Sequence, residues 1–186
     1  MNTIVLYCAL DKEIQEYQDN IIREIATKFN LNKIIDLNVE PHFTLKYHIT
    51  ITGEQLDFLE NIISDFCANN LKTKIKVGGY TSFPPSVTFT HVKFSKEAKL
   101  VFFHLIDLLR SIDWITWSPF DAENMHFHAT VADECGEKFE EVLHYLQGKE
   151  KHFDTWFDNI SIIKKIGEKD NVESWKVYRK FIFAKE

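Results

Sequence analysis

The sequence predicts an α+β fold in which two pseudo-symmetric β-α-β-type lobes place antiparallel sheets around a central cleft, with helices outside. Strand-like and helix-like segments follow one another along the chain, the same order of segments occurs twice, and one short tetrad of residues recurs in both halves. The chain has 186 residues, of which 45% are hydrophobic. This is enough for one well-packed core, so we expect 1–186 to be a single domain of two duplicated lobes, roughly 1–86 and 87–186.

The first half opens with an apolar segment at 3–10 that is typical of a buried strand. A helix is predicted at 12–29, because apolar residues recur there at three- and four-residue steps. Asp11 can cap its start, and Asn30 stands at its expected end. The remaining patterns of this half predict a strand at 41–47, a helix at 54–69 and a strand at 74–83.

The second half repeats this order in a consistent register. Lys12 and Lys96 open corresponding helices 84 positions apart, and His42 and His128 stand 86 positions apart. A repeat of this length is too long for a solenoid unit, which favours two lobes related by a pseudo-twofold axis. The expected elements of this half are a strand at 86–94, helices at 96–112 and 136–147, a strand at 125–132 and a final hairpin of 160–167 with 175–183.

The repeated tetrad is histidine, any residue, threonine and an apolar residue, and it occupies 42–45 and 128–131. Successive side chains of a strand point to opposite faces, so each histidine shares a face with its threonine while the other two residues face the opposite layer. If each lobe turns its polar pair toward the axis, two imidazoles and two hydroxyls meet in one cleft. We therefore expect catalytic roles for His42, Thr44, His128 and Thr130.

Two histidines that face one phosphorus have a direct chemical use. With ordinary pKa values near 6.5, one imidazole can be neutral and remove a proton from an attacking hydroxyl or water, while its protonated partner donates to the leaving oxygen. Threonine hydroxyls can donate hydrogen bonds to the non-bridging phosphate oxygens, where negative charge develops. The pattern predicts acid-base phosphodiester chemistry that needs no metal and no cofactor.

A third tetrad at 48–51 competes with the first, because His48 lies on the same strand parity as His42. Its histidine stands 80 positions before His128, whereas the flanking elements require 84 to 86. The register of the duplication therefore favours His42.

These features resemble the 2H phosphoesterase superfamily, which includes the bacterial 2′-5′ RNA ligase-like proteins and cyclic phosphodiesterases. The resemblance is carried by the paired tetrads with Pro41 before the first, by the duplicated lobes, and by the stretch VGGYTSFP at 77–84. It implies a metal-independent phosphodiesterase or transesterase that acts on a 2′,3′-cyclic or 2′-5′-linked phosphodiester of a nucleotide or short RNA end. It also implies that the histidines and threonines of both tetrads occupy the family's catalytic positions.

Four further residues are candidates for binding the substrate: Lys46, Tyr80, Phe83 and His126. Lys46 shares the expected strand face of Thr44 and can meet a phosphate, although a lysine at a strand end is usually solvated. Tyr80 and Phe83 follow a glycine pair and can stack on a base, with core packing as the alternative. His126 shares the face of His128, with a solvated strand histidine as the alternative.

Composition limits the partners. A net charge of −6 and a pI near 5.8 argue against a broad surface for duplex DNA, but a small phosphorylated ligand remains open. The three cysteines lack CxxC spacing, and the N-terminal stretch lacks the features of a signal peptide or membrane span. We expect a cytoplasmic monomer that does not bind membranes.

Two rival functions stay open at this point. His126 and His128, with His42 or Asp133, can form a metal site, since a His-x-His pair on a strand offers two imidazoles. A non-catalytic module that binds a nucleotide or cyclic phosphate is the other. The sequence does not tell which histidine is acid and which is base, whether the reaction is hydrolysis or ligation, or whether a 2′- or 3′-phosphate results.

Overall fold

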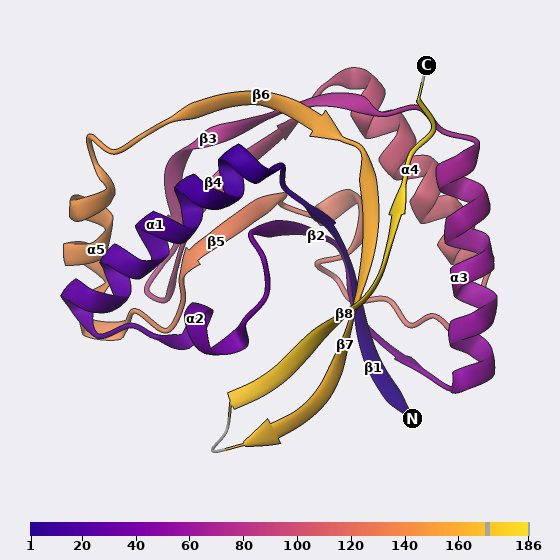
Figure 1. Cartoon of the computed structure of the whole chain (residues 1–186), viewed down its shortest axis with the longest axis horizontal. Coiled ribbons are helices and arrows are strands. Elements are labelled where there is room, and N and C mark those ends of the chain that lie inside the picture. The colour runs from indigo at the N-terminus through magenta and orange to yellow at the C-terminus, as the bar shows by residue number, and fades with distance from the viewer. Residues whose placement is uncertain (170–171, 186) are drawn as a thin grey trace.

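A computed structural model describes residues 1–169 and 172–185, which form two four-stranded antiparallel sheets with helices around them (Figure 1). The expected α+β class is confirmed. The first sheet has the order β2-β1-β7-β8 and the second the order β5-β4-β3-β6. In chain order the strands are β1 (Asn2–Ala9), β2 (His42–Ile51), β3 (Thr73–Phe83), β4 (Val87–Phe94), β5 (His128–Ala132), β6 (His152–Phe157), β7 (Asn159–Lys169) and β8 (Val172–Ile182).

Each sheet takes strands from both halves of the chain. The first sheet joins β1 and β2 to the C-terminal hairpin of β7 and β8, and the second joins β4 and β5 to β3. The sheets therefore do not follow the expected boundary at residue 86, because β3 crosses into the sheet of the second half. This exchange ties the two halves together through backbone hydrogen bonds of both sheets.

The helices lie outside the sheets, as expected. Helix α1 contacts β5, α3 contacts β7 and β8, and both α4 and α5 contact β3 and β4. The short helix α2 contacts β5 of one sheet and β8 of the other, and so bridges the two lobes. Their bounds are α1 (Lys12–Phe29), α2 (Lys33–Leu37), α3 (Gly53–Ala68), α4 (Lys96–Arg110) and α5 (Phe139–Leu146).

The helix ends follow their sequence signals closely. Asp11 caps α1 by accepting a hydrogen bond from the Ile14 amide at 3.1 Å, and Asn30 ends it in the left-handed conformation. Thr52 and Gln55 form a reciprocal capping box at the start of α3. No helix within the described ranges is both long and apolar enough to span a lipid bilayer.

Several elements differ from the expectation. Strand β5 begins at His128 rather than at 125, α4 ends at Arg110, and the helix expected at 136–147 divides into a 3₁₀ turn and α5. Neither α2, which has only five residues, nor β6 has a clear signal in the sequence. Strand β6 is an edge strand paired with β3, and its sequence lacks the apolar pattern of a central strand.

The main hydrophobic core joins both sheets to α3 and α4. Phe43, the second residue of the first tetrad, is fully buried in it and packs edge-on against Phe94, Phe127 and Phe157 at centroid distances of 5.5 to 6.0 Å. Ala129, the second residue of the other tetrad, belongs to the same core. The second positions of the two tetrads are thus packed into one interior, whereas Val131, the last residue of the second tetrad, lies in a smaller core beside α1 and α5.

Replacing Phe43 with alanine should lower the free energy of unfolding by about 3–5 kcal/mol, because it leaves a cavity among three aromatic rings. Phe58→Ala is a matched control on α3, where the phenyl ring is 51% exposed, and should change stability by less than about 1 kcal/mol. Urea denaturation of both variants measures the difference. Equal losses would show that the Phe43 cluster does not hold the two sheets together.

Candidate active site

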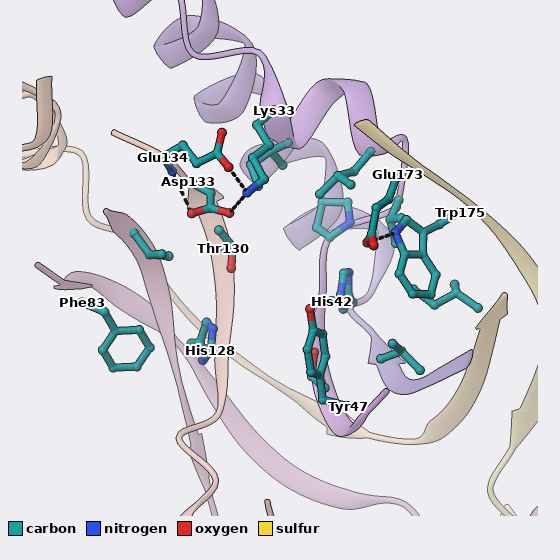
Figure 2. A pocket seen from close by; sticks show the side chains of 18 of the residues that line it. Lys33, His42, Tyr47, Phe83, His128, Thr130, Asp133, Glu134, Glu173 and Trp175 are labelled. Atoms are coloured by element: carbon teal, nitrogen blue, oxygen red, sulfur yellow. Dashed lines mark hydrogen bonds and ion pairs between the residues drawn. The ribbon is translucent and has the colours of Figure 1, made fainter. Parts of the chain in front are cut away.

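The candidate site lies where β2 and β5 meet. These strands are edge strands of their sheets, and they contact each other across the lobe boundary. A cavity of about 1110 Å³ opens there, large enough for a nucleotide-sized ligand. His42 and Thr44 of β2 and His128 and Thr130 of β5 all line it. Tertiary structure has brought both tetrads to one cavity (Figure 2).

The expected alternation is confirmed at both tetrads. His42 and Thr44 are partly exposed while Phe43 is buried, and His128 and Thr130 are partly exposed while Ala129 is buried. The polar pairs therefore face the cavity because the residues between them face the core. In each strand, the alternation of side chains places the polar pair at the cavity and the residue between them in the core.

The two imidazoles are held in the same way. Nδ1 of His42 lies 2.7 Å from the carbonyl oxygen of Glu40, and Nδ1 of His128 lies 2.6 Å from that of His126. A carbonyl oxygen only accepts, so each Nδ1 carries the proton that it donates. In the neutral ring Nε2 is then unprotonated and free to act as a base, and in the charged ring it holds a proton to give.

Neighbouring aromatic side chains support both rings. The Tyr7 ring meets His42 edge-on at 4.8 Å, and its hydroxyl donates to Oε1 of Glu40 at 2.9 Å. Phe83 and Phe89 flank His128 at 5.3 and 4.7 Å. These contacts fix the orientation of each imidazole and shield one side of it from water.

Both imidazoles are biased toward the neutral form. Burial lowers the pKa of His42 below its ordinary value, against a raising effect of the hydrogen bond to Glu40, and the charge of His128 lowers it further. Burial also lowers the pKa of His128, against a raising effect of the hydrogen bond to the His126 carbonyl, and the charge of the His126 ring lowers it further. The influence of His128 on His42 means that protonation of one ring disfavours protonation of the other, which is the arrangement that an acid-base pair needs.

Two of the four expected substrate-binding residues line the cavity. Phe83 is 42% exposed there, next to His128, and His126 also contributes to the wall. Tyr80 is absent from the wall and lies in the smaller core around α1 and α5, where its hydroxyl is 2.8 Å from that of Tyr17. Tyr80 therefore packs in the core, which was the alternative to base stacking.

The expected position of Lys46 is wrong. Its side chain is buried, and Nζ forms an ion pair with Asp121 at 2.9 Å and donates to the Tyr47 carbonyl at 2.7 Å. The cause is an irregularity in β2, which has two register shifts against β1. Thr44 pairs with Tyr7 and Lys46 pairs with the adjacent Leu6, so Leu45 is an extra residue between two neighbouring pairs. The extra residue breaks the alternation, so Leu45 and Lys46 are both buried.

The same irregularity brings an unexpected residue into the cavity. Tyr47, 54% exposed, lines it on the side of His42, and its other face stacks on His48 at a centroid distance of 3.9 Å. His48 itself, the histidine of the third tetrad, is not among the lining residues and has a positive φ of 37°. Alternation along the sequence contains no sign of a bulge, so Tyr47 was missed.

The upper wall of the cavity in Figure 2 consists of residues that no motif marks. Lys33 of α2 reaches Asp133 and Glu134, which follow β5, and Glu173 accepts a hydrogen bond from the Trp175 indole at 3.2 Å. Their positions depend on α2 and β8 lying over the cavity, which only the folded chain decides.

A metal site at His126 and His128 would need a third ligand. Among the residues that the structure describes, no group of three or more His, Cys, Asp or Glu side chains is close enough together to hold a metal ion. The structure places His42 and Asp133 on the cavity wall with the two histidines, but without the mutual closeness of a ligand set.

Several solved structures share this architecture. TT0787 of Thermus thermophilus superimposes with a TM-score of 0.67 at 13% identity over 98% of each chain. A phosphoesterase structure gives 0.66 at 12% identity over all of both chains. Escherichia coli LigT in complex with NADP⁺ gives 0.63 at 13% identity over 99% of this chain and 98% of its own. No family model and no curated protein sequence matches the chain.

The chain therefore has the two-lobed LigT-like fold over essentially its whole length. The two-lobed fold expected from the tetrads and the order of the elements is thereby confirmed.

Replacing Lys46 with methionine should destabilise the protein by about 3–5 kcal/mol, because Asp121 would remain buried without its partner. Lys76→Met is the matched control, since its ion pair with Asp154 is 73% and 82% exposed and should contribute less than about 1 kcal/mol. Thermal or urea denaturation measures both. A Lys46→Met variant as stable as wild type would argue against the buried pair and return Lys46 to the candidate ligand contacts.

Proposed function

We propose that this chain is a 2H-type phosphoesterase that cleaves a 2′,3′-cyclic or 2′-5′-linked phosphodiester of a nucleotide or short RNA end. The observation that carries the proposal is the pair of equivalent imidazoles, each anchored through Nδ1 to the carbonyl two residues before it, which line one cavity together with two threonines. A single histidine would explain acid or base chemistry alone. Two in equivalent settings account for both proton transfers of one displacement.

In the proposed reaction, Nε2 of the neutral histidine removes the proton from water or a ribose hydroxyl as its oxygen attacks phosphorus. The P–O bond to the leaving oxygen breaks, and Nε2–H of the charged histidine delivers a proton to that oxygen. The Thr44 and Thr130 hydroxyls donate hydrogen bonds to the non-bridging oxygens, which gain negative charge in the transition state. The two histidines exchange protonation states in one turnover, so the reverse reaction uses the same groups in opposite roles.

Similar structures support a ligand of nucleotide size. LigT has been crystallised with 3′-AMP, with NADP⁺ and with ATP, and it has the fold of this chain. Phe83 and Tyr47 add half-exposed aromatic rings on the His128 and His42 sides of the cavity. Such rings suit the stacking of a base on either side of a phosphodiester.

The proposal extends to the form in which the protein acts. Residues 1–186 would work as one monomeric unit, because strand exchange between the halves makes both sheets necessary for the site. Three free cysteines, Cys8, Cys67 and Cys135, are buried, which suits a reducing compartment such as the cytoplasm. No cofactor has a role in the proposed steps.

Activity is tested with 2′,3′-cyclic nucleotides and 2′-5′-linked dinucleotides in the presence of EDTA. His42→Ala and His128→Ala should each lower kcat/KM by about 10² to 10⁴, since each removes one proton transfer. His144→Ala, a change at an exposed histidine on α5, is the matched control and should retain wild-type kcat/KM. Nucleotide binding without turnover in the wild type would indicate a binding module, and chelator-sensitive turnover would indicate a metal-dependent hydrolase.

The pH dependence of kcat/KM should be bell-shaped with its maximum on the acidic side of pH 6.5. Activity rises with pH as the base loses its proton and falls as the acid loses its proton. Because burial lowers the pKa of both His42 and His128, both limbs move to lower pH. Initial rates at low substrate concentration between pH 4.5 and 8.5 measure the profile. A maximum above pH 7.5 would contradict the assignment of both limbs to these rings.

A further inference from the structure

The cavity wall is unusually acidic for a site that is proposed to bind a phosphate. Of the lining residues that the structure describes, seven carry a carboxylate, one is a lysine and none is an arginine. A phosphodiester carries one negative charge, which a protonated histidine and two threonine hydroxyls can balance. A further phosphate group on the substrate needs another positively charged side chain on this wall.

Lys33 is the lining lysine, and it is already paired. Its Nζ lies 2.7 Å from Oδ2 of Asp133 and 2.7 Å from Oε1 of Glu134, so two carboxylates share one ammonium. Burial by itself would lower the pKa of Lys33, but the hydrogen bonds to both carboxylates outweigh this effect and raise it. The three residues, which we call the Lys33 triad, carry a net negative charge.

The Lys33 triad lies next to the catalytic strand. Figure 2 shows it beside Thr130, and Asp133 follows Thr130 by three residues, about 10 Å along an extended chain. Helix α2 carries Lys33 across from the other lobe, and Ser86 donates a hydrogen bond to Oδ1 of Asp133 at 3.3 Å. The two carboxylates are therefore held at the cavity by both lobes.

Ion pairs of the other lining carboxylates leave the wall with a net negative charge. Asp121 is paired with the buried Lys46, and Glu173 is paired with Lys165 at 2.7 Å. Among the described residues, seven carboxylates line the cavity, and three lysines pair with them: Lys33, Lys46 and Lys165. A ligand with extra negative charge is repelled, because partly buried charges about 10 Å apart are screened less than they would be in open solvent.

We propose that the cavity selects monoanionic phosphodiesters and that Asp133 and Glu134, by occupying Lys33, are the residues that exclude substrates with an additional phosphomonoester. The inference rests on the proposed function for its catalytic readout. It names the substrate class as small cyclic or dinucleotide phosphodiesters without a terminal phosphate.

The experiment compares adenosine 2′,3′-cyclic phosphate with its 5′-phosphorylated form. Wild-type kcat/KM should favour the first by at least about tenfold at low ionic strength, and the preference should shrink as salt screens the wall. The double variant Asp133→Asn with Glu134→Gln frees Lys33 and should raise kcat/KM for the 5′-phosphorylated substrate at least about tenfold, and that for the other substrate by less. A gain of activity cannot arise from misfolding.

Two control proteins separate the triad from net charge. Adding Lys33→Gln to the double variant should abolish the gain. Glu24→Gln with Glu141→Gln changes the net charge equally at two exposed ion pairs and should leave the substrate preference as in wild type. A wild type that turns over both substrates equally, or a double variant with the wild-type preference, would overturn the inference.

Binding separates this inference from the proposed function. Calorimetry with adenosine 3′-monophosphate and adenosine 3′,5′-bisphosphate should show weaker binding of the bisphosphate to wild type and a reversal in the double variant. That result without turnover of any cyclic substrate would reject the catalytic proposal and uphold the charge selection. Turnover of a cyclic substrate together with equal affinity for both nucleotides would uphold the catalytic proposal and reject the charge selection.

Discussion

The packing of Phe43 against the phenylalanines of the second sheet is the contact on which the site depends. Phe43 lies between His42 and Thr44 on an edge strand, and Phe127 directly precedes His128. Burying these rings in one core fixes two edge strands from different sheets against each other, and the pleat then turns the polar residues outward. The histidines meet because their apolar neighbours do.

A local irregularity then decides what else reaches the cavity. The register shifts of β2 against β1 bury Lys46 and expose Tyr47, so a cation that would have met a phosphate instead pairs with Asp121. The cavity gains an aromatic face and loses a positive charge. This change in strand geometry removes one cation from the wall, and it shows how a bulge re-aims side chains without changing the fold.

The electrostatic setting of the two histidines is consistent with this wall. Burial lowers the pKa of both imidazoles, and a charge on one disfavours protonation of the other, while each Nδ1 donates to a carbonyl. Carboxylates near the site are engaged with lysines, an indole, a backbone amide or, in the case of Glu40, the Tyr7 hydroxyl. One phosphodiester charge can be balanced by the histidine pair and the threonines, and little positive charge remains for a second.

Local patterns in the chain were enough to establish the class of fold and to indicate the four polar residues of the tetrads, because periodicity and capping are properties of neighbouring residues. They also indicated Phe83 and His126 correctly as lining residues. The exchange of β3 and β7 between sheets, the burial of Lys46 and the meeting of Lys33 with Asp133 and Glu134 became visible only in the folded chain. These depend on strand pairing and on contacts between residues about 100 positions apart, and neither leaves a pattern in a short stretch of sequence.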